Sequence, residues 1–143
     1  MVKRSISLRL IPILALIPML AFGQDRTVIE VTIEAVGLNG DPPERNSAEG
    51  CMAFKPTVPQ VEHYFKHAFP VEGYMITTDR YSPCYATGSV TFSDNSSATW
   101  RLYSSGVASF FFNSNDHVYL YYKHNRWIDV TACTYGLGDE GDC

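Results

Sequence analysis

Short hydrophobic segments separated by turn residues fill the stretch between residues 84 and 122. Alternation of apolar and polar positions with a period of two is typical of half-buried strands, and Gly, Asn and Asp tolerate the backbone angles of tight turns. The pattern predicts four consecutive strands at residues 84–93, 98–104, 107–112 and 117–122. We therefore expect an antiparallel β-meander at the centre of the fold.

The turn lengths decide which side chains share a face of this sheet, because a shift of one residue moves a strand's side chains to the opposite face. We expect two-residue turns at Ser105-Gly106 and Ser114-Asn115, and an odd turn at Asp94-Asn95-Ser96. One face then becomes the core. It holds Val90, Phe92, Ala98, Trp100, Leu102, Val107, Phe111, Val118, Leu120 and Tyr122.

The opposite face of the predicted meander is more aromatic than a face in water usually is. It carries Thr91, Thr99, Arg101, Tyr103, Ala108, Phe110, Phe112, His117, Tyr119 and Tyr121. One interpretation is that residues 126–136, with Trp127, Ile128, Val130 and Tyr135, fold back over this face. The other is an exposed recognition surface, because Tyr and Arg are enriched at interface hot spots. Its candidate binding residues are Arg101, Tyr103, Phe110, Phe112, Tyr119 and Tyr121.

Outside the meander, residues 27–36 alternate as a strand at a sheet edge, and the Pro-rich residues 37–50 predict a mobile surface loop without regular structure. Thr57 can cap a helix that ends near Phe69, before Pro70. A further short strand is expected at residues 73–78. The predicted fold class is α+β, with an antiparallel meander sheet of four to six strands, one helix packed on one face, and disulfides.

The first 23 residues have the three parts of a secretory signal peptide, namely a basic start, an apolar stretch and small residues at a cleavage site after Gly23. The apolar stretch contains Pro12 and Pro18 and is too short to favour a transmembrane helix. We expect residues 24–143 to form a single exported domain, periplasmic or secreted, without stable membrane insertion after cleavage. Its oligomeric state is left open.

The whole chain has a formal net charge of −4, and every charged residue of the predicted signal is basic, so its removal leaves a more acidic domain. An acidic domain is a poor partner for nucleic acid or for an anionic membrane surface. The residues from Gly136 to Cys143 form a compact acidic tail, for which solvation is the ordinary interpretation.

The four cysteines would meet an oxidising compartment, where an even number favours disulfides. Cys84 opens the first meander strand and Cys133 follows the last, so we favour the pairs Cys84–Cys133 and Cys51–Cys143. Metal ligation by thiolates is disfavoured because the chain contains no Cys-x-x-Cys pair.

His63 and His67 stand four residues apart on the predicted helix, so that their imidazoles project from one face. They are the weak candidates for a metal site, with the third ligand undetermined. The simpler interpretation is two polar residues on a solvated helix face, so no cofactor is expected. The sequence contains no Gly-x-Ser-x-Gly motif, which would indicate a serine hydrolase.

A second candidate binding group follows the last strand, where loops on a rigid sheet often carry sites. It consists of His124, Arg126 and Trp127, beside Lys123 and Asn125. The alternative interpretation of this group is the capped end of a strand.

Several short motifs together resemble a loose group of small, exported, uncharacterised bacterial proteins. The resemblance spans most of residues 51–122 and rests on Phe54-Lys55-Pro56-Thr57, Tyr64-Phe65, Ser82-Pro83-Cys84-Tyr85-Ala86, Gly88, Phe92-Ser93-Asp94, Trp100-Arg101-Leu102, Gly106 and Tyr119-Leu120-Tyr121. It implies an exported bacterial protein and carries over no functional residue. More distantly, the architecture is similar to that of periplasmic inhibitor and immunity proteins.

From these patterns we expect a non-catalytic periplasmic module that binds another exported protein, with an inhibitor or an immunity protein as one form of it. The alternative is a small periplasmic metal-dependent or hydrolytic enzyme that uses His63 and His67.

Overall fold

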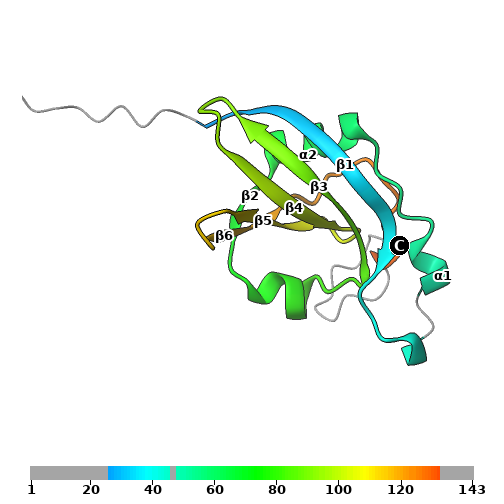
Figure 1. Cartoon of the computed structure of the whole chain (residues 1–143). Helices are drawn as coiled ribbons and strands as arrows, with labels where there is room; N and C mark the ends of the chain where they lie inside the picture. The colour runs from blue at the N-terminus through cyan, green and yellow to red at the C-terminus, as the bar shows by residue number, and fades with distance from the viewer. Residues whose placement is uncertain (1–25, 46–47, 133–143) are drawn as a thin grey trace, which may run out of the picture.

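The computed structural model describes residues 26–45 and 48–132 (Figure 1). Six strands form one antiparallel sheet in the order β1-β3-β4-β5-β6-β2, which confirms the predicted α+β class. The strands are β1 (Val28–Asn39), β2 (Phe69–Val71), β3 (Cys84–Phe92), β4 (Ser97–Tyr103), β5 (Val107–Phe112) and β6 (His117–Tyr121). The predicted signal peptide and the acidic tail lie outside the described residues.

The predicted meander is present as β3–β6, and each of its three turns has the same construction. The third turn residue has a positive φ in each case: 61° at Asn95, 84° at Gly106 and 62° at Asn115. The backbone N–H of this residue donates to the carbonyl of the last strand residue, as from Gly106 to Tyr103 at 3.0 Å. All three turns therefore contain three residues, the length at which a left-handed third residue closes a hairpin.

The predicted two-residue turns at Ser105-Gly106 and Ser114-Asn115 are wrong, and the difference reverses the two sides of β5. Trp100 faces Phe110 across the strands, and Thr99 faces Phe111. The two one-residue errors cancel at β6, where Leu120 stays on the buried side as predicted. Two residues were wrongly assigned to the core face, Val107 and Phe111, and three wrongly to the opposite face, Ala108, Phe110 and Phe112. We call the face that holds Trp100 and Phe110 the first face, and the face that holds Arg101 and Phe111 the second face.

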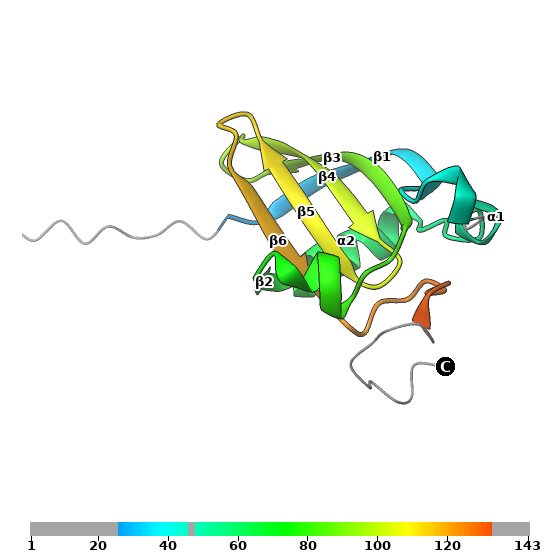
Figure 2. The same cartoon turned by 90° about the horizontal axis from the view of Figure 1, so that it is seen from below.

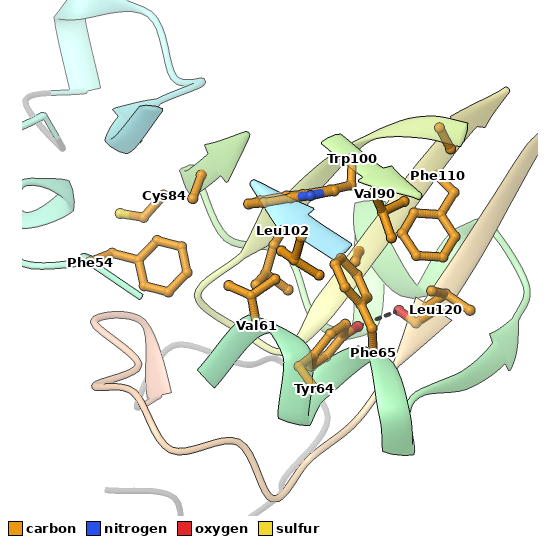
Figure 3. Close-up of a cluster of buried hydrophobic side chains, with 14 of the residues drawn as sticks. Phe54, Val61, Tyr64, Phe65, Cys84, Val90, Trp100, Leu102, Phe110 and Leu120 are labelled. Atoms are coloured by element: carbon orange, nitrogen blue, oxygen red, sulfur yellow. Dashed lines mark hydrogen bonds between the residues drawn. The ribbon is translucent and has the colours of Figure 1, made fainter. Parts of the chain in front are cut away.

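The predicted helix is present as α2 (Val58–His67). Its start is fixed by Thr57, whose backbone N–H donates to the Gln60 side chain at 2.8 Å. Val61, Tyr64 and Phe65 are buried, and Figure 3 shows them pointing into the cluster that contains Trp100, Leu102 and Phe110. The Tyr64 hydroxyl reaches the carbonyl oxygens of Gly106 and Leu120, at 3.0 and 3.2 Å.

Trp100 lies directly against a glycine of the neighbouring strand. Its ring covers Gly88, which is its register partner on β3, and its Nε1–H donates to the Ser89 carbonyl at 3.0 Å. A side chain at Gly88 would overlap both the Trp100 ring and the backbone oxygen of Thr32 on β1. Trp100, the largest side chain of the core, therefore fits only because Gly88 has no side chain.

The two edge strands pair with their neighbours less regularly than the inner strands do. β1 is an edge strand, as predicted, but its pairing with β3 shifts register at three places, and it extends to Asn39 through Gly37, which has a φ of 66°. β2 pairs with β6 over three residues and contains Pro70, which has no N–H to donate and is tolerated at an edge. The predicted strand at residues 73–78 is wrong, because this segment forms the short π-helix η2 (Met75–Asp79).

The segment between β1 and α2 contains two short helical turns, η1 (Pro43–Arg45) and α1 (Ala48–Cys51), where sequence analysis predicted no regular structure. α1 brings Cys51 to the start of β3, where it forms a disulfide with Cys84. The predicted pairs Cys84–Cys133 and Cys51–Cys143 are therefore both wrong. Cys133 and Cys143 themselves lie outside the described residues.

Candidate functional site

The second face of the sheet divides into a covered half and an open half. In Figure 2 the green segment of residues 75–79 crosses one end of β5 and β6. On this half Val107 and Ser109 are buried, and the guanidinium of Arg80, directly after the segment, lies 5.4 Å from the centre of the Tyr121 ring. Gly73, just before the segment, lies against Tyr119, which is half-buried at the border with the open half. Within the described chain, the cover over this face therefore comes from the segment before β3.

One interpretation of the sequence predicted that residues 126–136 fold over the second face. Residues 126–132 lie elsewhere. Trp127 packs instead with Phe54 and Tyr64, with ring centres 5.8 and 5.6 Å apart, and its Nε1–H donates to the Ser104 carbonyl at 2.9 Å. The Arg126 carbonyl accepts a hydrogen bond from Gln60 of α2 at 2.7 Å. This segment closes one end of the core beside α2, and the remaining residues of the predicted cover, 133–136, lie outside the described part of the chain.

The open half of the second face is formed by side chains from three adjacent strands. Phe111 of β5 lies between its register partners Thr99 of β4 and His117 of β6, and it is 43% exposed. The His117 ring contacts both Phe111 and Tyr119, with ring centres 6.4 and 5.3 Å apart. We call Thr99, Arg101, Phe111, His117 and Tyr119 the open sheet surface.

Arg101 is held at the border of this surface by an aromatic side chain. Its guanidinium lies 4.6 Å from the centre of the Tyr85 ring, in the geometry of a cation–π contact, while the residue remains exposed. Tyr85 in turn contacts Tyr103, with ring centres 6.0 Å apart. A guanidinium that lies over an aromatic ring still carries its N–H donors, so this exposed side chain can meet a partner's acceptors.

The structure thus brings together only part of the predicted binding residues. Arg101, Tyr103, Tyr119 and Tyr121 are on the second face, whereas Phe110 and Phe112 are on the first. Phe110 is only 7% exposed and packs against Phe65, with ring centres 4.7 Å apart. Sequence reasoning missed Phe111 as a surface residue; the Ser-Ser-Gly and Asn-Ser-Asn turns carried the signal, because a left-handed third residue favours a three-residue turn.

A groove also runs between α2 and the outer part of the first face, with a volume of about 600 Å³. Its floor is apolar and includes Phe65, Phe92 and Leu120, and its rim includes Lys66 and Arg26. Arg26 is not a free cation, because it forms an ion pair with Asp94 at 2.8 Å and lies over the Phe92 ring at 5.5 Å. Two hydrogen bonds from Ser96 and this ion pair lower the pKa of Asp94.

The third predicted group, His63 and His67, forms a ring cluster on the surface of α2. The two imidazole centres are 4.2 Å apart, and both rings pack against Tyr122, which also contacts His124. Partial burial, together with the nearby charges of Arg126, His67 and Lys66, lowers the pKa of His63. Across residues 26–45 and 48–132, no three His, Cys, Asp or Glu side chains come together as a metal centre.

Within the same residues, no helix is long and apolar enough to cross a membrane. Comparisons with protein-family models, with curated proteins and with solved structures find no match to this chain.

Proposed function

We propose that the protein is a non-catalytic, exported binding module that recognises another exported protein through the open sheet surface. The observation that carries this proposal is Phe111, a large apolar side chain left 43% exposed on an inner strand of the sheet. Arg101, His117 and Tyr119 surround it with polar and aromatic groups. An aromatic anchor beside arginine and tyrosine is the composition that interface hot spots favour.

We further infer that α2 packs across the first face and leaves the second face to the partner. The burial of Val61, Tyr64 and Phe65 among Trp100 and Phe110 supports this arrangement. The rigid sheet beneath Phe111 then presents its side chain without a large ordering cost on binding, which favours affinity.

The proposed location is the periplasm or the cell exterior. The signal-like sequence at residues 1–23 and the Cys51–Cys84 disulfide support it, because disulfides persist in oxidising compartments. Inhibition of an exported enzyme, or immunity to one, is one form that such a binding function takes. This form is suggested by analogy with the architecture and address of periplasmic inhibitor and immunity proteins.

The proposal is tested by site-specific photo-cross-linking in the cell envelope of the organism that encodes the protein. A cross-linking residue at position 111 should capture a specific protein, and one at the similarly exposed Val118 on the first face should not. In a pull-down, Phe111→Ser and Arg101→Glu should each lose that protein, and Val118→Ser should keep it.

If Phe111→Ser folds and retains every specific partner, the open sheet surface is not the binding site. Phe110→Ala is unsuitable for this comparison, because Phe110 is part of the core and its removal would destabilise the fold. The melting temperature of each variant should therefore be measured alongside the pull-down.

A further inference from the structure

The exposed side of α2 carries two imidazoles one helical turn apart, a spacing that places side chains next to each other. The ring centres of His63 and His67 are 4.2 Å apart, with an angle of 39° between the ring planes. His67 is exposed and His63 is half-buried. Both rings are thus adjacent and reachable from solvent.

The hydrogen bonding of His67 defines which of its ring nitrogens has a lone pair that can bind a metal ion. Its Nδ1 lies 2.7 Å from the backbone carbonyl oxygen of His63. A carbonyl oxygen only accepts, so Nδ1 carries the proton, and in the neutral ring Nε2 keeps its lone pair. Metal-ligating histidines commonly donate their second N–H to a backbone carbonyl in this way, which fixes the tautomer and the ring orientation.

Tyr122 supports both rings from beneath. The His67 ring is stacked on it, with centres 5.4 Å apart and planes 25° apart, and the His63 ring meets it edge-on at 5.9 Å. These contacts restrict the ring rotations that an isolated surface histidine would have. Part of the ordering cost of a two-histidine chelate is therefore already met by the fold.

We propose that His63 and His67 form a two-imidazole site for a divalent transition metal of the Cu²⁺, Ni²⁺ and Zn²⁺ class. Imidazole nitrogen suits these ions, whereas Mg²⁺ and Ca²⁺ prefer oxygen ligands. The remaining coordination positions are open to water or to a partner's side chain. His124 contacts the same tyrosine, with ring centres 6.0 Å apart, but it does not join the two histidines in a group of three candidate ligands.

The charged side chains around the two histidines affect the affinity for the metal ion. Lys66 lies between the two histidines in the sequence, and both Lys66 and Arg126 act electrostatically on His63. A divalent cation is repelled by these groups as well, so the binding is weaker than that of two imidazoles alone. Removing the Lys66 charge should therefore tighten metal binding, by about twofold for one exposed charge.

The test is calorimetric titration of the untagged, disulfide-intact protein with Ni²⁺ and Zn²⁺ salts. We expect saturable one-to-one binding that weakens at least about tenfold in His63→Ala and in His67→Ala. His124→Ala is the matched control and should leave the affinity unchanged, because His124 is exposed and contacts Tyr122 without joining the histidine pair. Mg²⁺, titrated at the same concentrations, should show no binding.

Nitrogen-detected NMR separates a direct ligand from a structural effect. Zn²⁺ should shift the Nε2 signal of His67 and a ring-nitrogen signal of His63, and it should leave the His67 Nδ1–H in place. His63→Gln and His67→Gln provide second variants if an alanine variant fails to fold. Binding that persists when both histidines are replaced, or a loss of the same size in His124→Ala, would overturn the proposal, as would the absence of saturable binding. None of these outcomes depends on the open sheet surface, so this inference and the proposed function can fail separately.

Discussion

Gly88 has no side chain, and this leaves room for the ring of Trp100, the largest residue of the core. The indole is only 1% exposed, and it fits because the adjacent strand has no Cβ at the point of closest approach. A glycine inside a strand usually weakens the strand, because it has no side chain to pack and loses much chain entropy on folding. Here that loss is offset by the burial of the tryptophan ring.

Gly88→Ala should therefore destabilise the protein by at least about 2 kcal/mol, since the new methyl group overlaps both a ring and a backbone oxygen. Chemical denaturation followed by circular dichroism measures the change. Gly50→Ala is the matched control, because Gly50 is in α1 and nothing lies within 4 Å of the position that a Cβ would take there. Alanine at this position should be neutral or slightly stabilising, so equal losses in the two variants would contradict the proposed close contact.

At the scale of elements, turn length decides which aromatic side chains are on the surface. Phe110 and Phe111 are chemically identical neighbours, and the hydrophobic pattern alone permits either one to face the core. The choice between them was made by the turns around β5, each of which holds one residue more than predicted. Periodicity was sufficient to predict β1, the four strands of the meander and α2, but not β2. It did not determine the register, which depends on left-handed backbone angles at three positions.

Asn115→Ala tests this role of the turns. Asparagine tolerates a φ of 62° better than alanine, so the substitution should cost about 1 kcal/mol. Asn113→Ala, an exposed substitution in the same turn at a position without a positive φ, should change the free energy of unfolding much less. Asn115→Gly should keep the stability of the parent protein, because glycine adopts this conformation freely. A fully stable Asn115→Ala would mean that the turn does not constrain the strand register.

At the scale of the whole molecule, the Cys51–Cys84 disulfide ties the segment between β1 and α2 to the start of the meander. The linked cysteines are 33 residues apart in the sequence. The expected pairing of Cys84 with Cys133 failed because it assumed that both ends of the meander lie together. No local sequence pattern indicates that α1 returns Cys51 to β3. The packing of Trp127 against the core was unpredicted for a related reason, since its neighbours Phe54 and Tyr64 are distant in the sequence.

Replacing both Cys51 and Cys84 with alanine should lower the stability by about 4 kcal/mol, because the unfolded chain gains entropy when a link across 33 residues is removed. Thermal unfolding under non-reducing conditions measures the loss. Peptide mapping of the unreduced parent protein should find Cys51 and Cys84 in one linked species. A peptide that joins Cys84 to Cys133 would contradict this connectivity.

The two edge strands have a consequence for how this protein can meet another. A sheet with a regular open edge can grow by adding a strand from a second chain, which leads to strand exchange or fibrils. β1 interrupts its ladder with register shifts and exposes Glu30 and Glu34, and β2 is three residues long with a proline in the middle. Neither offers a continuous row of backbone groups to an incoming strand. The sheet is thus protected from open-ended polymerisation, and its faces are better suited to association than its edges.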